Sequence, residues 1–467
     1  MSRAAGRPGH GGPHGAVAGT GTGNTVVIVG GGLAAMATAA RLAKRGHRVT
    51  LLQRTERLGA DWRPTAPGGP GPLPEVLTLP AAWRDLFKKS GRILPAELAR
   101  AGLDLVPAPP TRHVFAGGEE LVLGGDRGEQ FHRMAASYGD AVADSWRTLV
   151  DSLEPVWHRV RNLGLETSLL AARQLRPHRR DLLWGRTVAD LAATQPHPHL
   201  RALVEASAWR QGQDPARTPA FVASRLNVER TFGRWMVVDE HGRPAGSERL
   251  LDLLEARLIA RRVEIVRYDG PIGFDGSARR PDGRALATEV VGAVLADGRP
   301  DAVVLTEGLH DPAATYGLRT RATRRVSGLG PVLAPRLSSI PTGSPDPDSP
   351  GPGSLSASPP RAPGPGPVLT ETVDHTTRRV SWATPARTLL HDWGAATVAP
   401  DRGPAWDGEA SWLCRLPVRL GERLYSAGPW GRGGDDLAGV LTSAALATYD
   451  AHFDLTGLDT HPSNKDQ

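Results

Sequence analysis

Gly30, Gly32 and Ala35 form a G-x-G-x-x-A pattern, which is typical of a turn that binds a diphosphate group through the polypeptide backbone. Gly30 allows a tight turn, and Gly32 has no Cβ, so a pyrophosphate can approach the main chain. Ala35 is small enough for a helix to pack closely on a sheet. Leu33 and Ala34 lie at the start of that helix, where unpaired backbone N–H groups favour phosphate. The pattern predicts dinucleotide binding, and the alternative is an ordinary glycine-rich loop.

The position that commonly holds an acidic residue for the adenosine ribose is occupied by Gln53, followed by Arg54. A glutamine amide can accept a hydrogen bond from a ribose hydroxyl, but as a neutral group it binds less strongly than a carboxylate. Gln53 and Arg54 together could instead suit a 2′-phosphate. A 2′-phosphate at this place would indicate NADP(H), so the sequence leaves the identity of the dinucleotide open.

The residues around the glycine turn predict the elements that position it. Residues 26–29 are β-branched and apolar, as in a buried parallel strand. Residues 33–45 are rich in alanine and end in basic residues before Gly46, which indicates a helix, and residues 47–52 follow as a second strand. This βαβ unit predicts an α/β fold with a Rossmann-type domain, interleaved with a mixed β-sheet and helical substrate domain.

Composition excludes several classes of function. The chain has 467 residues and a net charge of +7 that is spread along it, whereas a nucleic-acid-binding protein would be expected to carry a basic block. Its single cysteine, Cys414, excludes a disulfide framework and a thiolate metal site. His197 and His199 lack partners at ligand spacing, so we predict no metal site. No apolar run approaches the roughly 20 residues of a membrane span, and residues 1–23 read as a disordered leader without a secretory core, so we expect a cytoplasmic protein.

The middle of the chain is predicted to be a helical cap. Apolar residues recur at helical spacing in residues 77–90 and through residues 130–223. Residues 169–186 mix arginines with leucines and Trp184, which could rest on an anionic membrane surface. The alternative, an arginine-rich solvated face over core leucines, is favoured because Pro177 interrupts the helix.

The second half alternates helices and strands. Residues 247–260 predict a helix with Ser247 as its N-cap, and strands are predicted at 263–266, 289–295, 302–306, 368–373, 378–382 and 395–398. Residues 338–367 are rich in proline, serine and glycine, as in a flexible insertion. A buried strand at 424–427 leads into a glycine-rich turn and a final helix at 436–453, which repeats the strand–glycine–helix order of the N-terminal unit.

Four stretches, taken in order, resemble one family. They are VVIVGGGLAAMATAARLAKRGHRVTLLQRTERLGADW, LTLPAAWRDLFKKSG with DLVPAPPTRHVF, QDPARTPAFVASRLNVERTFGRW, and RLYSAGPWGRGGDDLAGVLTSAALAT. Their order is similar to that of the phytoene desaturase-like branch of the FAD-dependent amine oxidase superfamily. The resemblance implies an FAD-binding domain from residues 24–75, 245–310 and 415–455, a substrate domain from 76–244 and 311–414, and a tail at 456–467.

The resemblance also implies a chemistry. FAD would lie along the Rossmann crevice with its isoalloxazine facing a mostly apolar tunnel, and hydride would pass from a C–H bond of a polyene or isoprenoid-like substrate to the flavin. No catalytic acid or base is demanded. The residues implied to contact the cofactor are Gly30, Gly32, Leu33, Ala34, Ala35, Gln53, Arg54, Arg57, Gly59, Val266, Gly428, Gly434, Leu437 and Ala438.

Several positions depart from the family pattern. Ala60 and Asp61 replace the glycine and arginine of R-x-G-G-R, Pro271 has no N–H for an adenine contact, and Pro429 replaces an acidic residue. These departures, together with Gln53, keep the first of two alternatives open, and the pair Gln53 and Arg54 keeps the second open. One is a relative without cofactor that acts as a partner in a biosynthetic complex, and the other is an NADP(H)-binding reductase.

Overall fold

The computed structural model describes residues 23–66, 69–165, 172–269, 300–320, 323–324, 329–341, 369–405, 408–409, 415–431 and 436–461. Pro271, Cys414, Gly434, the predicted strand at 289–295 and most of the 338–367 insertion lie outside these residues.

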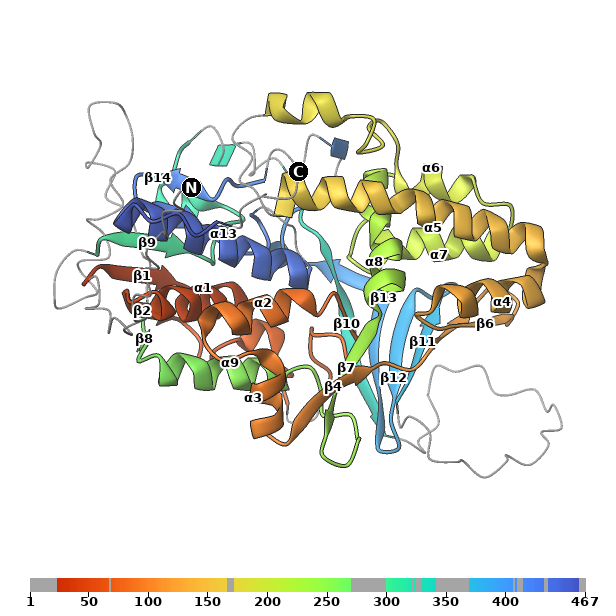
Figure 1. The fold of residues 1–467 in the computed structure, drawn as a ribbon, viewed down its shortest axis with the longest axis horizontal. Coiled ribbons are helices and arrows are strands. Elements are labelled where there is room, and N and C mark those ends of the chain that lie inside the picture. The colour runs from red at the N-terminus through yellow and green to blue at the C-terminus, as the bar shows by residue number, and fades with distance from the viewer. Residues whose placement is uncertain are drawn as a thin grey trace, which may run out of the picture.

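The first sheet is the Rossmann-type sheet that the sequence predicts. Its strands follow the order β14 (Arg419–Gly421), β15 (Leu424–Ser426), β9 (Ala302–Leu305), β1 (Thr25–Val29), β2 (Arg48–Gln53) and β8 (Glu264–Arg267). All neighbours pair in parallel except β14 and β15, which are antiparallel. Strands from both ends of the chain and from its middle thus lie side by side (Figure 1).

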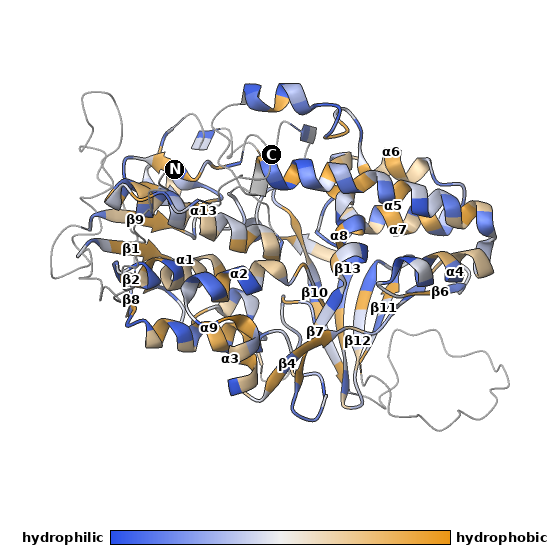
Figure 2. Cartoon of the chain, viewed as in Figure 1, coloured by the Kyte–Doolittle hydropathy of each residue, from blue (hydrophilic) through white to orange (hydrophobic). Residues whose placement is uncertain are grey.

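Alternate residues of β1 face opposite sides of this sheet, because successive side chains of a strand point in opposite directions. Val26 and Ile28 belong to the core formed with the helices, whereas Val27 and Val29 belong to a smaller core on the other face. Figure 2 shows β1 and β9 as hydrophobic. The helices of this part of the molecule are α1 (Leu33–Lys44), α2 (Ala81–Ser90), α3 (Leu94–Arg100), α9 (Arg249–Ala260), α10 (Pro312–Tyr316) and α13 (Leu437–Thr456).

Two further sheets and a helical cap make up the rest. The second sheet has the order β10 (Leu333–Pro341), β13 (Arg387–Val398), β12 (Arg379–Ala383), β11 (Thr370–Asp374), β5 (Thr111–Val114) and β6 (Glu120–Leu123), and the third has β3 (Leu77–Thr78), β7 (Arg234–Asp239) and β4 (Leu103–Pro107). The cap contains α4 (Arg127–Tyr138), α5 (Asp140–Val160), α6 (Val188–Ala193), α7 (Pro198–Trp209) and α8 (Arg225–Phe232). Short 3-10 or π turns are η1 (Ala60–Trp62), η2 (Arg161–Leu165), η3 (Ala172–His178), η4 (Ala220–Ser224) and η6 (Pro400–Arg402).

The predicted helical cap is confirmed, and its apolar stripes form one core. Trp146, Val150 and Leu153 of α5 are buried against residues of α7 and η4. Leu175 and Leu182, from the stretch with a proposed membrane face, are fully buried in the same core. This burial favours a packed cap segment over a membrane-facing surface. None of the helices in the described ranges is at once long and apolar enough to cross a bilayer.

The predicted start of the helix at 77–90 is wrong. Residues Leu77–Thr78 form β3, and α2 begins only at Ala81. Leu79 adopts a left-handed φ of 49°, and it precedes Pro80. The residue before a proline is disfavoured in the α conformation, so the helix starts after the proline.

The prediction that Ser247 caps a helix is also wrong. The helix α9 begins at Arg249 with Glu248 in the capping position. The Ser247 hydroxyl donates instead to the Pro74 carbonyl oxygen at 2.5 Å, so it ties the helix entry to the loop before β3.

One strand was not predicted, and another extends beyond its predicted limits. Ser338 to Pro341, placed in the flexible insertion, complete β10, and β13 begins at Arg387 rather than at 395. The two strands pair in antiparallel fashion, with Ser338 opposite Leu390. A segment that contains serine and proline thus forms a strand because β13 supplies its hydrogen-bond partners. Its own sequence does not predict a strand, since strand formation depends strongly on the neighbouring strand.

Buried neutral histidines make the fold sensitive to acid. Burial lowers the pKa of His47, His375 and His391 to about 4 each, against about 6.5 in an unfolded chain. Between these two values the unfolded chain binds more protons than the folded one, so stability is present above pH 6.5 and is lost as pH falls toward 4.

We therefore expect the free energy of unfolding to fall as pH is lowered from 7 to 4.5, by up to about 1.4 kcal/mol per pH unit for each histidine. The melting temperature should fall with it. The change His391→Asn should flatten this slope, because an amide can still donate to the Gly71 carbonyl but does not titrate in that range. Circular dichroism melts at several pH values test this. The control is His241→Asn, where the ring is 64% exposed; an equal flattening there would contradict the assignment.

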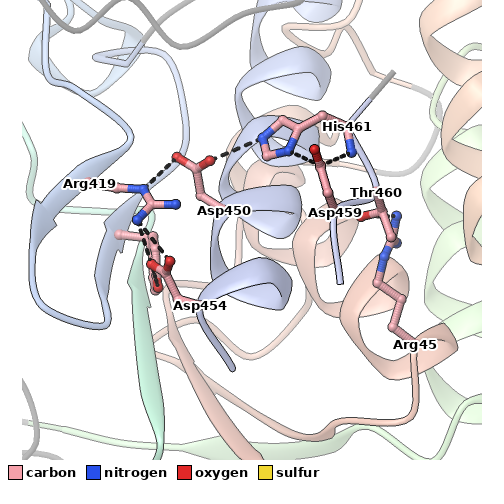
Figure 3. A network of polar contacts seen from close by, with 8 residues as sticks. Arg45, Arg419, Asp450, Asp454, Asp459, Thr460 and His461 are labelled. Atoms are coloured by element: carbon pink, nitrogen blue, oxygen red, sulfur yellow. Dashed lines mark hydrogen bonds and ion pairs between the residues drawn. The ribbon is translucent and has the colours of Figure 1, made fainter. Parts of the chain in front are cut away.

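A polar network anchors the end of α13 to β14 and to the segment after the helix (Figure 3). The Asp450 side chain is 7% exposed and lies between Arg419 Nε at 3.2 Å and His461 Nε2 at 3.1 Å. Arg419 also binds Asp454 at 2.8 Å, and His461 binds Asp459 at 2.7 Å. Asp450 thus joins two partners from separate segments.

Replacing Asp450 by Asn should lower the free energy of unfolding by about 1–3 kcal/mol, because a buried carboxylate between two partners is lost. Asp459→Asn, at an exposed carboxylate of the same network, is the matched control and should cost less. Urea denaturation of both variants measures the difference. Equal losses would show that Asp450 has no special role.

Candidate active site

The carboxyl ends of β1, β2, β9 and β15 meet at one edge of the first sheet, and the loops that follow them enclose a cavity of about 430 Å³. Parallel α/β sheets bind ligands at this edge. We name this space the glycine-turn cavity. Its walls include Gly31, Gly32, Leu33, Ala34, Arg54, Asp61, Trp62, Pro72, Thr306, Glu307, Arg402, Pro429 and Trp430.

The predicted glycine turn has the geometry expected of it. Gly30 has a φ of 121°, and a Cβ there would lie 2.3 Å from Thr306 Oγ1, so only glycine fits. A Cβ on Gly31 would meet Gln53 Cβ at 2.9 Å, which leaves no room either. Gly32 differs, because the nearest atom to a Cβ there is Asp61 Oδ2 at 3.5 Å. Gly32 therefore leaves space at the N-terminus of α1, and Ala35 is fully buried beneath it.

Gln53 and Arg54 lie beside this turn. Gln53 is 7% exposed, and its Oε1 atom has no hydrogen-bond partner among the described residues. The Arg54 Nε donates to Glu307 Oε1 at 2.9 Å, and its guanidinium lies 4.5 Å from the Tyr268 ring centre. Tyr268 donates to the same Glu307 oxygen at 2.5 Å, and its burial and this contact raise the pKa of the phenol. Arg54 thus faces the cavity with its charge compensated.

The C-terminal glycine turn faces the same cavity. Gly428 has a φ of 127°, its Cβ would lie 3.4 Å from the Thr306 carbonyl oxygen, and its N–H donates to Ser443 Oγ at 3.1 Å. Asp436 caps α13 by accepting from Gly439 N at 2.6 Å, as expected for an acidic residue there. Gly434 lies outside the described residues.

Three of the predicted contact residues lie away from this cavity. Arg57 forms an ion pair with Asp252 on α9 at 3.1 Å. Gly59 adopts a left-handed φ of 68°, and its N–H donates to the Gly31 carbonyl at 2.7 Å, so it supports the turn from behind. Val266 is paired with Leu52 in the sheet. Their contact with a cofactor stays a prediction.

A second cavity of about 300 Å³ adjoins the first and lies between the cap and the second sheet. Trp62, Pro72 and Arg402 line both cavities, and the Arg402 guanidinium lies 5.9 Å from the Trp62 ring centre. Leu437 and Ala438, predicted as cofactor contacts, line this second cavity. We name it the tryptophan chamber, because its walls include Trp62, Trp146, Trp157, Trp382 and Trp393.

Trp235, Trp382 and Trp430 are large side chains that could line a substrate tunnel or serve in packing. Trp382 is 2% exposed and lines the chamber, and Trp430 is 4% exposed and lines the glycine-turn cavity. Trp235 lies outside both cavities, where its Nε1 donates to the Phe232 carbonyl. Two of the three thus combine both roles.

Sequence reasoning missed Glu307 and Arg402. Glu307 directly follows the residues predicted as the strand at 302–306, so its place at the carboxyl end of a parallel strand was a usable signal. Arg402 lies in η6, a short turn after β13, and no motif marks it.

His197 and His199 both make contacts with other parts of the protein. His197 caps α7 by accepting from His199 N at 3.2 Å, and His199 stacks on Phe115 at 4.0 Å. In the described part of the chain, no group of three or more His, Cys, Asp or Glu side chains could hold a metal ion.

Known proteins are similar to this chain in sequence and in fold. Residues 28–94 match the family described as the NAD(P)-binding Rossmann-like domain. Hydroxyneurosporene desaturase from Cereibacter sphaeroides is 30% identical over 303 residues, which cover 62% of this chain and 56% of that protein. The chain thus matches little more than half of that relative's length.

Solved structures share the fold across nearly the whole chain. An oxidoreductase from Methanosarcina mazei superimposes with a TM-score of 0.58 at 14% identity, covering 90% of this chain and 99% of that one. Cyclohexylamine oxidase from Brevibacterium oxydans gives 0.53 at 12% identity, covering 93% and 98%. A putrescine oxidase variant gives 0.56 at 13% identity, covering 93% and 99%. Residues 28–94 thus match an NAD(P)-binding Rossmann-like domain, and the chain as a whole shares the fold of these oxidoreductases.

Proposed function

We propose that this chain is an FAD-dependent oxidoreductase that removes hydride from an apolar, polyene or isoprenoid-like substrate. The observation that carries the proposal is the direct contact between the two cavities, which share Trp62, Pro72 and Arg402 as walls. A cofactor held at the glycine turn would therefore lie next to the tryptophan chamber. The name of the desaturase relative supports the choice of a polyene-like substrate.

The residues of the glycine-turn cavity fit FAD. Gly30 and Gly32 form the cradle for its diphosphate, and the N-terminus of α1 supplies N–H groups. The unpaired Oε1 of buried Gln53 is an acceptor for a ribose hydroxyl. The charge of Arg54 is compensated by Glu307, which favours FAD over a dinucleotide with a 2′-phosphate. When bound, FAD supplies the hydride acceptor.

The chain's own residues bind and desolvate the substrate. The tryptophans of the chamber provide apolar walls that exclude water. Burial lowers the pKa of His391 to about 4 and that of His113 far below its ordinary value, so both rings are neutral near pH 7. The His391 Nε2 donates to the Gly71 carbonyl at 2.8 Å, which fixes the tautomer. Neither ring is required as an acid or a base for removal of hydride.

The purified chain should show flavin absorption bands, either as isolated or after incubation with FAD and gel filtration. Gly32→Ala should weaken FAD binding at least tenfold with little loss of stability, because its Cβ fills the space for the diphosphate and meets protein only at 3.5 Å. Titration followed by flavin fluorescence measures the affinity. A chain that never takes up FAD would contradict the proposal and favour a partner without cofactor.

One residue of the cavity opposes the diphosphate. The Asp61 carboxylate lies 3.5 Å from the position of a Cβ on Gly32, next to the helix N-terminus that would bind phosphate. Two like charges at about 4 Å repel each other by about 1–4 kcal/mol at the dielectric constants of a protein surface. Asp61 therefore reduces the affinity for any dinucleotide.

Asp61→Asn should bind ADP and FAD about tenfold more tightly than the natural chain, because the repulsion is removed. Isothermal titration calorimetry with ADP measures the diphosphate contact without flavin chemistry. Asp104→Asn, at an exposed carboxylate on β4, is the control. Unchanged affinity in the Asp61 variant would mean that the carboxylate moves aside at no cost.

A further inference from the structure

The tryptophan chamber contains more charge than an apolar substrate requires. Arg210, Arg225, Arg234 and Arg402 line it, against the carboxylates of Glu229 and Asp436. Arg225 is paired with Asp436. The remaining arginines are distributed around the same apolar walls, where an unneeded cation is costly.

Arg210 and Arg234 share one buried carboxylate. Arg210 follows α7, Arg234 begins β7, and both side chains reach Glu371 on β11, which is 1% exposed. The Arg210 Nη2 lies 3.3 Å from Glu371 Oε1, and Arg234 binds the other carboxylate oxygen. Glu371 is not part of the chamber wall, so the two guanidinium groups lie between it and the cavity.

Two guanidinium groups thus line the chamber, and both are paired with the same carboxylate, that of Glu371. The Arg234 side chain is 9% exposed, and its burial lowers the pKa of the guanidinium to about 10. In the described part of the chain, Glu229 forms no ion pair within 4 Å with either guanidinium, although its charge acts on Arg234 from α8. The Arg210 side chain is 29% exposed, so it remains accessible from the cavity.

The charges of these arginines also act on two neighbouring histidine rings. His113 lines the chamber, and after burial and His375 the charges of Arg210 and Arg234 lower its pKa further. Arg402 and Arg210 act on His391 in the same direction. Because both rings are neutral near pH 7, they add no charge of their own to that of the arginines and carboxylates.

We propose that Arg210, supported by Arg234, binds an anionic group of the substrate, and that the substrate is an amphipathic polyene or isoprenoid with a terminal carboxylate. The tryptophan walls take the apolar chain, and the guanidinium of Arg210 offers paired N–H donors that match a carboxylate. This inference rests on the proposed function for the class of substrate, but it concerns binding in the chamber and not the cofactor.

Binding of two probes that differ only in their end group tests the inference. Retinoic acid and retinol are titrated into the full chain, and quenching of the tryptophan fluorescence is measured. The natural chain should bind retinoic acid at least tenfold more tightly than retinol. Arg210→Gln should reduce this ratio to below threefold, and Arg210→Lys should keep a larger ratio than the glutamine variant.

A second variant moves the ratio in the opposite direction. Glu371→Gln keeps the shape of the side chain and removes the charge behind the arginines, so it should increase the preference for retinoic acid. Arg147→Gln is the control, because Arg147 is 48% exposed on α5 and binds Asp144. If Arg210→Gln does not fold, as judged by its thermal melt, Glu371→Gln decides alone.

Equal binding of both probes by the natural chain, or binding of neither, overturns the inference. So does a preference that survives Arg210→Gln and does not grow in Glu371→Gln, because arginines with a purely structural role would leave it unchanged. None of these results depends on flavin absorption. A failure here therefore differs from a failure of the proposed function, which is read from the FAD titration.

Discussion

The contact between the ends of β1 and β9 is the constraint on which the site depends. The Thr306 hydroxyl donates to the Val29 carbonyl at 2.8 Å and occupies the place where a side chain on Gly30 would lie. Gly31 is held equally closely against Gln53. With these two glycines fixed by packing, the chain turns sharply and α1 begins directly at the edge of the sheet. The space at Gly32 is the consequence of that turn.

Charge inside the two cavities is organised in pairs drawn from distant elements. Arg54 forms an ion pair with Glu307, and Arg225 forms one with Asp436. Glu371 forms ion pairs with both Arg210 and Arg234. In a medium of low dielectric constant, an isolated ion is far more costly than a paired one. The histidines near these pairs respond by remaining neutral. The cavities are therefore apolar in their walls while retaining a few charges of defined position.

The sequence was a reliable guide where structure is set locally. The glycine turn, the alanine-rich α1 and the strand before the final helix all depend on residues within about 30 positions of one another, and their period and glycine spacing predict them. The cap followed from its apolar spacing in the same way. The capping role of Ser247 failed because its hydroxyl finds a partner 173 residues away. Arg54 and Glu307 are 253 residues apart in the sequence, and Arg210 and Glu371 are 161 residues apart. No local sequence pattern can therefore predict either contact.

The strand order of the first sheet also determines how early during synthesis this sheet can finish folding. In this sheet β9 lies between β1, which ends at residue 29, and β15, which begins at residue 424. During synthesis the chain leaves the ribosome from its N-terminus, at about 5–20 residues per second. The edge that forms the glycine-turn cavity is therefore unfinished until almost the whole chain has emerged. Until then β9 lacks its neighbour β15, and its free edge exposes backbone groups and apolar side chains.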